Sequence, residues 1–228
     1  MKMRCFIVIA LTLMLRVIPV KAGPEAGDSC SAGTDDKALA ACRQAVAERP
    51  DHLPLLRQFA RALIDNGQFD EAAGIQARIV RLAPRDWAAN YAYAGTLGFI
   101  RRYDEALSPI LRALESRPKH VPTLQTAALI YTHIGRNAEA RAFTERAAAL
   151  GSIVAMYDMV RYYTQGLDVR KSDAEAFRWT RRAAENGHVF AMWRMVEIYL
   201  EGEFGQAPDD AQAEAWAARH RAAAAVRR

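Results

Sequence analysis

The sequence predicts an all-α fold, a solenoid of stacked antiparallel helix pairs. Apolar residues recur at spacings of three and four, the period of an amphipathic helix. No stretch shows the sustained alternation of β-branched residues that is typical of strands. Three prolines, Pro50, Pro84 and Pro118, follow one another at intervals of 34 residues. A fixed period of this length indicates a repeat protein, in which each unit packs on its neighbours.

Residues 1–22 have the features of an export signal. Two basic residues precede an apolar run of eleven, and Val20 and Ala22 stand at −3 and −1 of an expected cleavage site before Gly23. Eleven apolar residues are too few to cross a hydrocarbon core of roughly 30 Å. We therefore expect a cleaved signal peptide, a periplasmic or secreted protein, and no stable membrane anchor after cleavage. A retained interfacial helix is the alternative.

Cleavage changes the charge balance of the chain. Residues 1–22 contain four of the 31 basic residues and none of the 26 acidic ones, so the mature chain carries a formal charge of +1. Nucleic-acid binding depends largely on a strong positive field. We therefore expect no nucleic-acid partner.

The prolines mark the ends of 34-residue units between residues 53 and 150. In the segment GQFDEA, Gly67 can end a first helix in the left-handed conformation. Asp70 can cap the second helix, and Glu71 suits its first turn. Ala72 is small where two helices cross closely. Matching residue types recur 34 and 68 positions later, at Tyr103, Asp104, Glu105 and Ala106, then Gly135, Glu139 and Ala140.

This pattern resembles the tetratricopeptide repeat, a helix–turn–helix unit. The resemblance implies three such repeats over 53–150 and a right-handed superhelical α-solenoid. Arg101 departs from the pattern because it stands where the helix-ending glycine is expected. Unrelated alanine-rich helices without a solenoid are the alternative interpretation.

The flanking segments are shorter or longer than this unit. Residues 23–34 are expected to be a flexible N-terminal segment, and residues 35–52 correspond to the second half of a repeat that caps the stack. From Gly151 the period lengthens to 36 or 37 residues, with an Ala-x-x-Trp-x-x-x-Ala-Ala-x-x-Gly pattern at 176–187. This pattern is similar to the Sel1-like repeat and implies two helix pairs over 151–222. The tail 223–228 is expected to fray.

The sequence contains no recognisable catalytic, cofactor or metal motif. None of the five histidines lies three or four residues from another histidine or a cysteine, as zinc sites require. His52 and His120 share one repeat position, where we expect solvated side chains. Trp179 and Trp216 also share a repeat position, and we expect both to be core residues rather than ligand contacts. The sequence predicts a protein that is not an enzyme and needs no cofactor.

Two functions remain open. The first is a non-catalytic scaffold or adaptor that binds a peptide or an envelope protein on its concave surface. The second is binding or hydrolysis of a cell-wall ligand, peptidoglycan or a β-lactam, since some cysteine-rich Sel1-like proteins have been linked with β-lactams. Those proteins carry a cysteine pair in each repeat, and this chain has no cysteine after Cys42.

The resemblance to tetratricopeptide repeats also implies which residues form the concave wall. In that family the wall consists mainly of the second, fifth, ninth, twelfth and thirteenth positions of each first helix. The corresponding candidates for a partner-binding groove are Arg57, Arg61, Tyr91, Gly95, Gly98, Phe99, Gln125 and His133. Arginines beside aromatic residues would suit a peptide with an acidic end. The alternative is that the two aromatic side chains pack inside the superhelix and the arginines are merely solvated.

Cleavage would remove Cys5 and leave two cysteines in an oxidising compartment. The even number and the compartment predict a disulfide between Cys30 and Cys42. The alternative is a buried, reduced Cys42 and a free Cys30.

Overall fold

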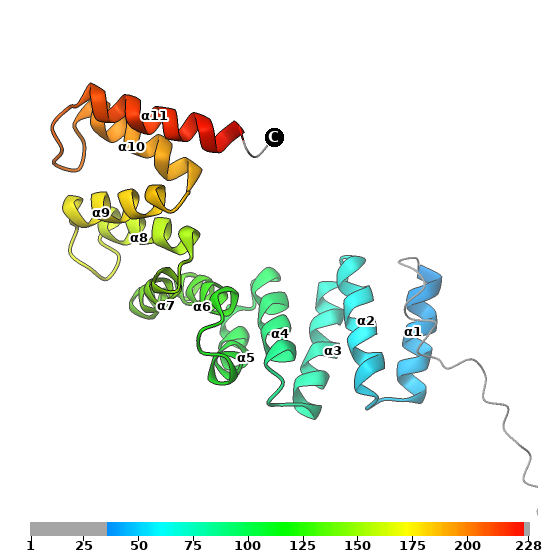
Figure 1. The fold of residues 1–228 in the computed structure, drawn as a ribbon. Helices are drawn as coiled ribbons and strands as arrows, with labels where there is room; N and C mark the ends of the chain where they lie inside the picture. Colours follow the sequence, from blue (N-terminus) through cyan, green and yellow to red (C-terminus); the bar gives the residue numbers. More distant parts are fainter. Residues whose placement is uncertain (1–35, 226–228) are drawn as a thin grey trace, which may run out of the picture.

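The computed structural model describes residues 36–225, and this part of the chain consists of helices joined by short connections, without a strand (Figure 1). The predicted signal peptide and residues 23–34 lie outside it. The helices are α1 (Asp36–Glu48), α2 (Leu53–Asp65), α3 (Phe69–Leu82), α4 (Trp87–Phe99), α5 (Tyr103–Ser116), α6 (Val121–His133), α7 (Asn137–Ala149), α8 (Ile153–Gln165), α9 (Asp173–Glu185), α10 (Val189–Glu201) and α11 (Asp210–Ala225).

The helices pack as successive pairs, which confirms the predicted all-α solenoid. Each even-numbered helix from α2 to α10 packs most extensively on the helix that follows it, and each pair packs on the next. Figure 1 shows the result as an open arc, with α2, α4, α6, α8 and α10 on its inner side. These five helices form the concave surface, which we call the inner groove.

The periodic prolines lie where the sequence analysis places them, between helix pairs. Pro50, Pro84 and Pro118 follow the last residues of α1, α3 and α5. A proline restrains the residue before it to an extended conformation, so each helix ends at this point.

Left-handed residues mark the turns inside the pairs. Gly67 and Gly135 have φ values of +71° and +78°. Arg101 takes the same conformation, with φ +63°, although it has a Cβ atom that glycine lacks. Gly166 and Gly202 end α8 and α10 in the left-handed region and open the longer loops of the C-terminal pairs.

The second helices begin differently from the prediction. Asp70 does not cap α3, because the helix begins at Phe69 and Asp70 already has a place in the first turn. A capping side chain belongs to the non-helical residue before the helix, which here is Gln68. Glu71 instead accepts hydrogen bonds from Arg43 of α1 at 2.9 and 2.7 Å.

Two of the histidines have a structural role that the sequence analysis did not predict. Nδ1 of His52 accepts a hydrogen bond from the Leu55 N–H at 3.3 Å, and Nδ1 of His188 accepts one from the Ala191 N–H at 3.1 Å. Nδ1 of His120 lies 2.7 Å from Oγ1 of Thr123. His52 is exposed, as expected, but its imidazole also caps the unpaired first turn of α2. The expectation of a solvated side chain is wrong for His120, which is half-buried against Thr123 and the rings of Trp87 and Tyr91.

The core runs through the stack as two buried clusters that meet at α3 and α4. A small residue is buried at one position of each pair, namely Ala72, Ala106, Ala140, Ala176 and Ala213, none of them more than 3% exposed. Trp179 and Trp216 are also buried, as predicted. The core therefore follows the repeat period of the sequence.

The C-terminal helix is longer than expected. The predicted tail 223–228 begins within α11, which continues to Ala225, because alanine has the highest helix propensity. Residues 226–228 lie outside the described part of the chain. None of the described helices is long and apolar enough to span a membrane.

Replacing Arg101 by glycine should stabilise the fold. A left-handed non-glycine residue costs on the order of 1 kcal/mol, and glycine removes this cost while adding some unfolded-state entropy. We expect Arg101→Gly to raise the free energy of unfolding by about 0.5 kcal/mol in urea titrations. Arg101→Ala is the matched control: it keeps the strained backbone and should leave stability nearly unchanged. A loss of stability in Arg101→Gly would show that the conformation is not strained.

Candidate functional site

The inner groove begins with a small cavity between α2, α3 and α4. Its volume is about 310 Å³. Alanines leave the space open, and two arginines of α2 lie at the same opening. The cavity is lined by Arg57, Ala60, Arg61, Ile64, Gln76, Ile79, Ala88, Ala89 and Ala92. We call it the Gln76 cavity after its buried polar residue.

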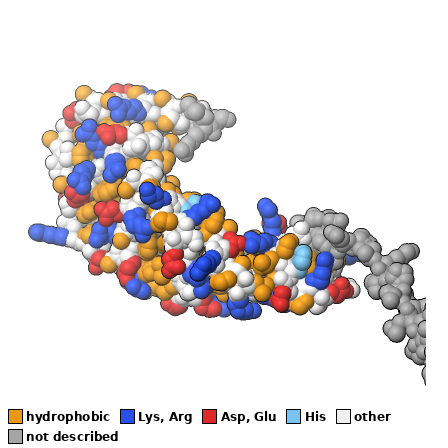
Figure 2. All heavy atoms as spheres, turned by 60° about the horizontal axis from the view of Figure 1, so that its bottom comes forward, with side chains coloured by type: hydrophobic (Ala, Val, Ile, Leu, Met, Phe, Trp, Pro, Cys, Tyr) orange, Lys and Arg blue, Asp and Glu red, His pale blue; other side chains and the backbone are white. Residues whose placement is uncertain are grey.

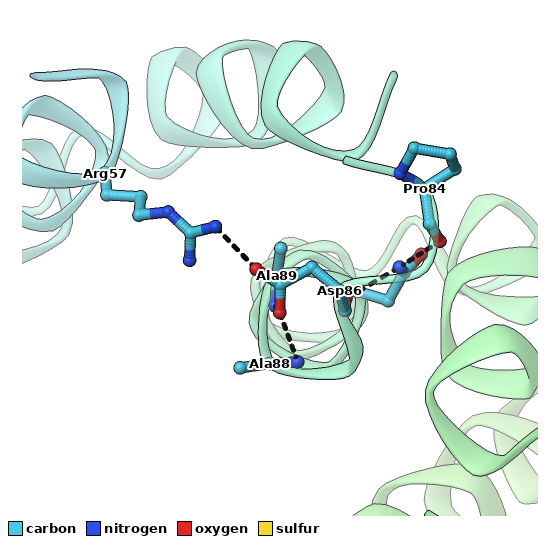
Figure 3. A network of polar contacts seen from close by, with 6 residues as sticks. Arg57, Pro84, Asp86, Ala88 and Ala89 are labelled. Atoms are coloured by element: carbon cyan, nitrogen blue, oxygen red, sulfur yellow. Dashed lines mark hydrogen bonds and ion pairs between the residues drawn. The ribbon is translucent and has the colours of Figure 1, made fainter. Parts of the chain in front are cut away.

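Arg57 is already engaged within the protein. Its Nη2 lies 2.5 Å from Oδ2 of Asp86, the residue that precedes α4 (Figure 3). Oδ1 of the same carboxylate accepts hydrogen bonds from the Ala88 and Ala89 N–H groups at 2.9 and 3.2 Å. Partial burial would raise the pKa of Asp86, but these contacts outweigh it and hold the pKa below its ordinary value. Arg57 therefore links two neighbouring helix pairs.

Arg61 differs from Arg57 because it makes no ion pair with any residue of the described chain. Its side chain is exposed at the mouth of the Gln76 cavity. Of the two predicted arginines, Arg61 is thus the one whose charge remains open to a partner.

The predicted aromatic residues on α4 have different surroundings. Tyr91 is half-buried and its ring meets His120 edge-on at 5.7 Å between centroids. Phe99 is 67% exposed, with its ring 4.2 Å from that of Phe69. A Cβ atom added to Gly95 or Gly98 would meet nothing within 4 Å, so the space in front of this helix is open.

The two candidates on α6 have internal contacts. Nε2 of Gln125 donates to Oγ of Ser152 at 3.2 Å, and Ser152 caps α8 through the Ala155 N–H. His133 is exposed and stacks on Tyr103 with 4.2 Å between ring centroids. Both side chains line the inner side of the stack, yet each also joins neighbouring helices.

The largest hollows of the inner groove lie further along the chain, where Gln125 and His133 are the only lining residues that the sequence analysis named. Two neighbouring hollows of about 720 and 560 Å³ share Val154 and lie along α6, α8 and α10, and His220 in the second half of α11 also lines the second of them. Exposed apolar residues line them, chiefly Leu129, Val154, Phe190 and Trp193.

Four rings form a contiguous group here, which we call the aromatic strip: Tyr157, His188, Phe190 and Trp193. Tyr157 stacks on His188 at 4.7 Å and meets Phe190 at 5.5 Å, and Phe190 lies 5.3 Å from Trp193. Tyr157 and Trp193 occupy equivalent positions 36 residues apart, as do Val154 and Phe190. Extending the concave positions into 151–222 would have identified them.

Charged residues accompany the aromatic strip. Asp158 lines the first hollow and is exposed to solvent, but the surrounding groove walls keep part of the water away from its carboxyl group. This desolvation raises the pKa of Asp158, although the nearby charges of Arg161 and His188 oppose the rise. Arg194 donates to Glu197 at 2.9 Å and also pairs with Glu203. Figure 2 shows basic and acidic side chains interspersed along the visible face.

Two further features concern Cys42 and the side chains that can bind a metal ion. Cys42 is buried in α1. Its predicted partner Cys30 lies outside the described residues, so their pairing stays a prediction. Within residues 36–225, no group of three or more His, Cys, Asp or Glu side chains could hold a metal ion.

Solved structures share this fold. The crystal structure of MamA is 19% identical and covers 74% of this chain and 96% of its own, with a TM-score of 0.62. A Sel1 repeat protein from Oxalobacter formigenes is 21% identical, covers 82% and 79%, and has a TM-score of 0.52. YrrB, a TPR protein with an unusual peptide-binding site, is 15% identical, covers 84% and 93%, and has a TM-score of 0.56. At these identities the likeness concerns the fold.

Family models match both ends of the chain. The Tetratricopeptide repeat model matches residues 31–96, and the Sel1 repeat model matches residues 153–188 and 189–219. No curated protein sequence matches the chain. The Sel1 model matches the part in which its pattern was found. The Tetratricopeptide repeat model matches the predicted half-repeat and the first of the three predicted repeats, and residues 97–152 are matched by neither model. The chain is therefore a tetratricopeptide repeat protein with Sel1 repeats at its C-terminal end.

Proposed function

We propose that this protein is a non-catalytic scaffold of the cell envelope that binds a peptide or an envelope protein in its inner groove. One observation carries the proposal: six of the nine exposed large hydrophobic residues in the described chain lie on the inner helices α4, α6, α8 and α10. Exposed apolar residues that gather on one surface mark sites where another molecule binds.

The family supports this function at a coarser level. Tetratricopeptide and Sel1 repeats indicate protein or peptide partners, and the similar structure of YrrB belongs to a protein with a peptide-binding site. Stacked repeats provide an extended concave surface of the kind that such partners need. The periplasmic location rests on the signal-peptide features of residues 1–22.

The proposed groove has two chemically different sections. The N-terminal section contains six candidates of the sequence analysis, and the other two, Gln125 and His133, line the first hollow of the C-terminal section. The six are Arg57, Arg61, Tyr91, Gly95, Gly98 and Phe99. The C-terminal section is the apolar depression around the aromatic strip. A partner that spans both would meet exposed positive charge at one end and exposed rings at the other.

Removing the exposed rings should weaken partner binding. The experiment retrieves partners of the mature protein by crosslinking in an envelope extract and measures the affinity of each purified partner by calorimetry. We expect the double variant Phe190→Ala/Trp193→Ala to lose at least tenfold in affinity, since truncated aromatic anchors commonly cost more than 1 kcal/mol.

The control for this variant is Leu111→Ala on α5, outside the inner helices. Circular dichroism should show both proteins folded. A double variant that binds each partner as tightly as the unaltered protein would contradict the proposed use of the groove.

Export should remove residues 1–22. We expect the intact mass of the protein from a periplasmic fraction to equal that of a chain that begins at Gly23, because the cleavage site follows Ala22. A membrane-bound protein that retains these residues would contradict the prediction.

The mature protein should contain a Cys30–Cys42 disulfide. Closing this short loop is expected to stabilise the fold by roughly 2–3 kcal/mol. The measurement is a thiol titration of the unreduced, denatured protein, with the reduced protein as control. Two titratable thiols before reduction would disprove the bond.

A further inference from the structure

The Gln76 cavity contains a buried polar group that the fold leaves without a hydrogen bond. Gln76 lies on α3 and is only 5% exposed. Its Oε1 has no hydrogen-bond partner among the described residues. The indole Nε1 of buried Trp179 is also without a partner among these residues. In contrast, the buried asparagine and threonine side chains of this part of the chain each make at least one hydrogen bond: Asn90, Thr96, Thr123, Thr144 and Thr180. A buried amide without a partner costs free energy, so Gln76 requires an explanation.

The surroundings of Gln76 favour an apolar guest. Ala60, Ala88 and Ala92 leave room, and Ile64 and Ile79 supply apolar walls. The volume of about 310 Å³ lies at the lower end of the range for ligand pockets, which begins at about 300 Å³. An aliphatic side chain can enter such a space, and a neighbouring N–H group can donate to Gln76.

The charge at the cavity mouth favours an acidic group next to that side chain. Arg57 is neutralised by Asp86 at 2.5 Å, whereas Arg61 has no ion pair in the described chain. Asp65 lies one turn further along α2 but does not line the cavity. A guanidinium group binds a carboxylate through two parallel hydrogen bonds, which gives direction as well as attraction.

We propose that the Gln76 cavity binds an aliphatic side chain of an extended partner segment, with an adjacent aspartate or glutamate on Arg61 and a backbone N–H of the segment on Gln76. The occupant is thus a peptide segment that carries an acidic residue beside leucine, isoleucine or methionine. This inference rests on the proposed scaffold function and specifies the chemistry of the partner.

The test uses synthetic peptides as probes and the mature full-length protein. An array of twelve-residue peptides in a Gly/Ser background pairs Leu, Ile, Met or Phe with a neighbouring Asp, Glu, Lys or Ser. We expect the tightest binding for an aliphatic residue beside an acidic one. Fluorescence anisotropy in solution then measures the affinity of the best peptides.

Three variants separate the contacts. Ala92→Leu should fill the cavity and reduce affinity at least tenfold. Arg61→Glu should abolish binding of the acidic peptides and permit binding of the matching lysine peptides. Arg81→Glu on α3 is the matched control, because Arg81 is exposed and does not line the cavity. The affinity of this variant for the best peptides should stay unchanged.

A stability measurement tests Gln76 independently of any partner. Gln76→Met keeps the length of the side chain and removes the unpaired amide, so we expect the midpoint of thermal unfolding to rise by about 2–4 °C. The same variant should bind the best peptides at least tenfold more weakly. A lower midpoint would mean that the amide supports the fold, and this outcome would overturn the proposed role of Gln76.

The outcomes also distinguish this inference from the scaffold function. An array without preference for the acidic–aliphatic pair, or equal binding by Ala92→Leu, would overturn the cavity proposal. If partners from the envelope extract still bind these variants but lose affinity for Phe190→Ala/Trp193→Ala, the scaffold function stands and the cavity proposal fails. A protein that retrieves no partner at all contradicts the scaffold function itself.

Discussion

The close packing of two helices at a buried alanine is the constraint on which the rest of this solenoid depends. Each of the five helix pairs has such a residue, from Ala72 in the first to Ala213 in the last. A larger side chain would separate the two helices and change the apolar surface that the pair presents to its neighbours. One pair cannot bury its own apolar face, so the stack is the smallest stable unit.

The connections turn this local packing into an arc. Left-handed residues such as Gly67 reverse the chain within a pair, whereas Pro84 and its equivalents separate one pair from the next. The longer loops after Gly166 and Gly202 belong to the C-terminal pairs, where the repeat period also lengthens. Because every first helix takes the same place in its unit, five of them line the inner side of the arc.

The inner groove is therefore a consequence of the stacking, but its chemistry changes along its length. The first pairs place Arg61 beside an alanine-lined cavity, and the last pairs place exposed rings beside Asp158 and Arg161. Internal contacts already hold part of the surface: Arg57 pairs with Asp86, and Gln125 bonds to Ser152. Such contacts fix the shape of the groove before a partner binds, which reduces the ordering cost of association.

The sequence by itself determined the helices, the repeat period and the buried alanines. These features depend on residues within one or two turns of each other, since a proline that follows a helix or a left-handed glycine ends the helix locally, although Pro109 is accommodated inside α5. The left-handed conformation of Arg101 could be anticipated for the same reason.

Only the tertiary structure decided which groove residues are free. Arg57 meets a carboxylate 29 positions away, whereas Arg61, one turn further on, meets none in the described chain. The burial of Gln76 and the contact between Tyr157 and Phe190 likewise depend on how far each helix is rotated against its neighbour. That rotation results from the packing of whole helix faces, so a local pattern does not contain it.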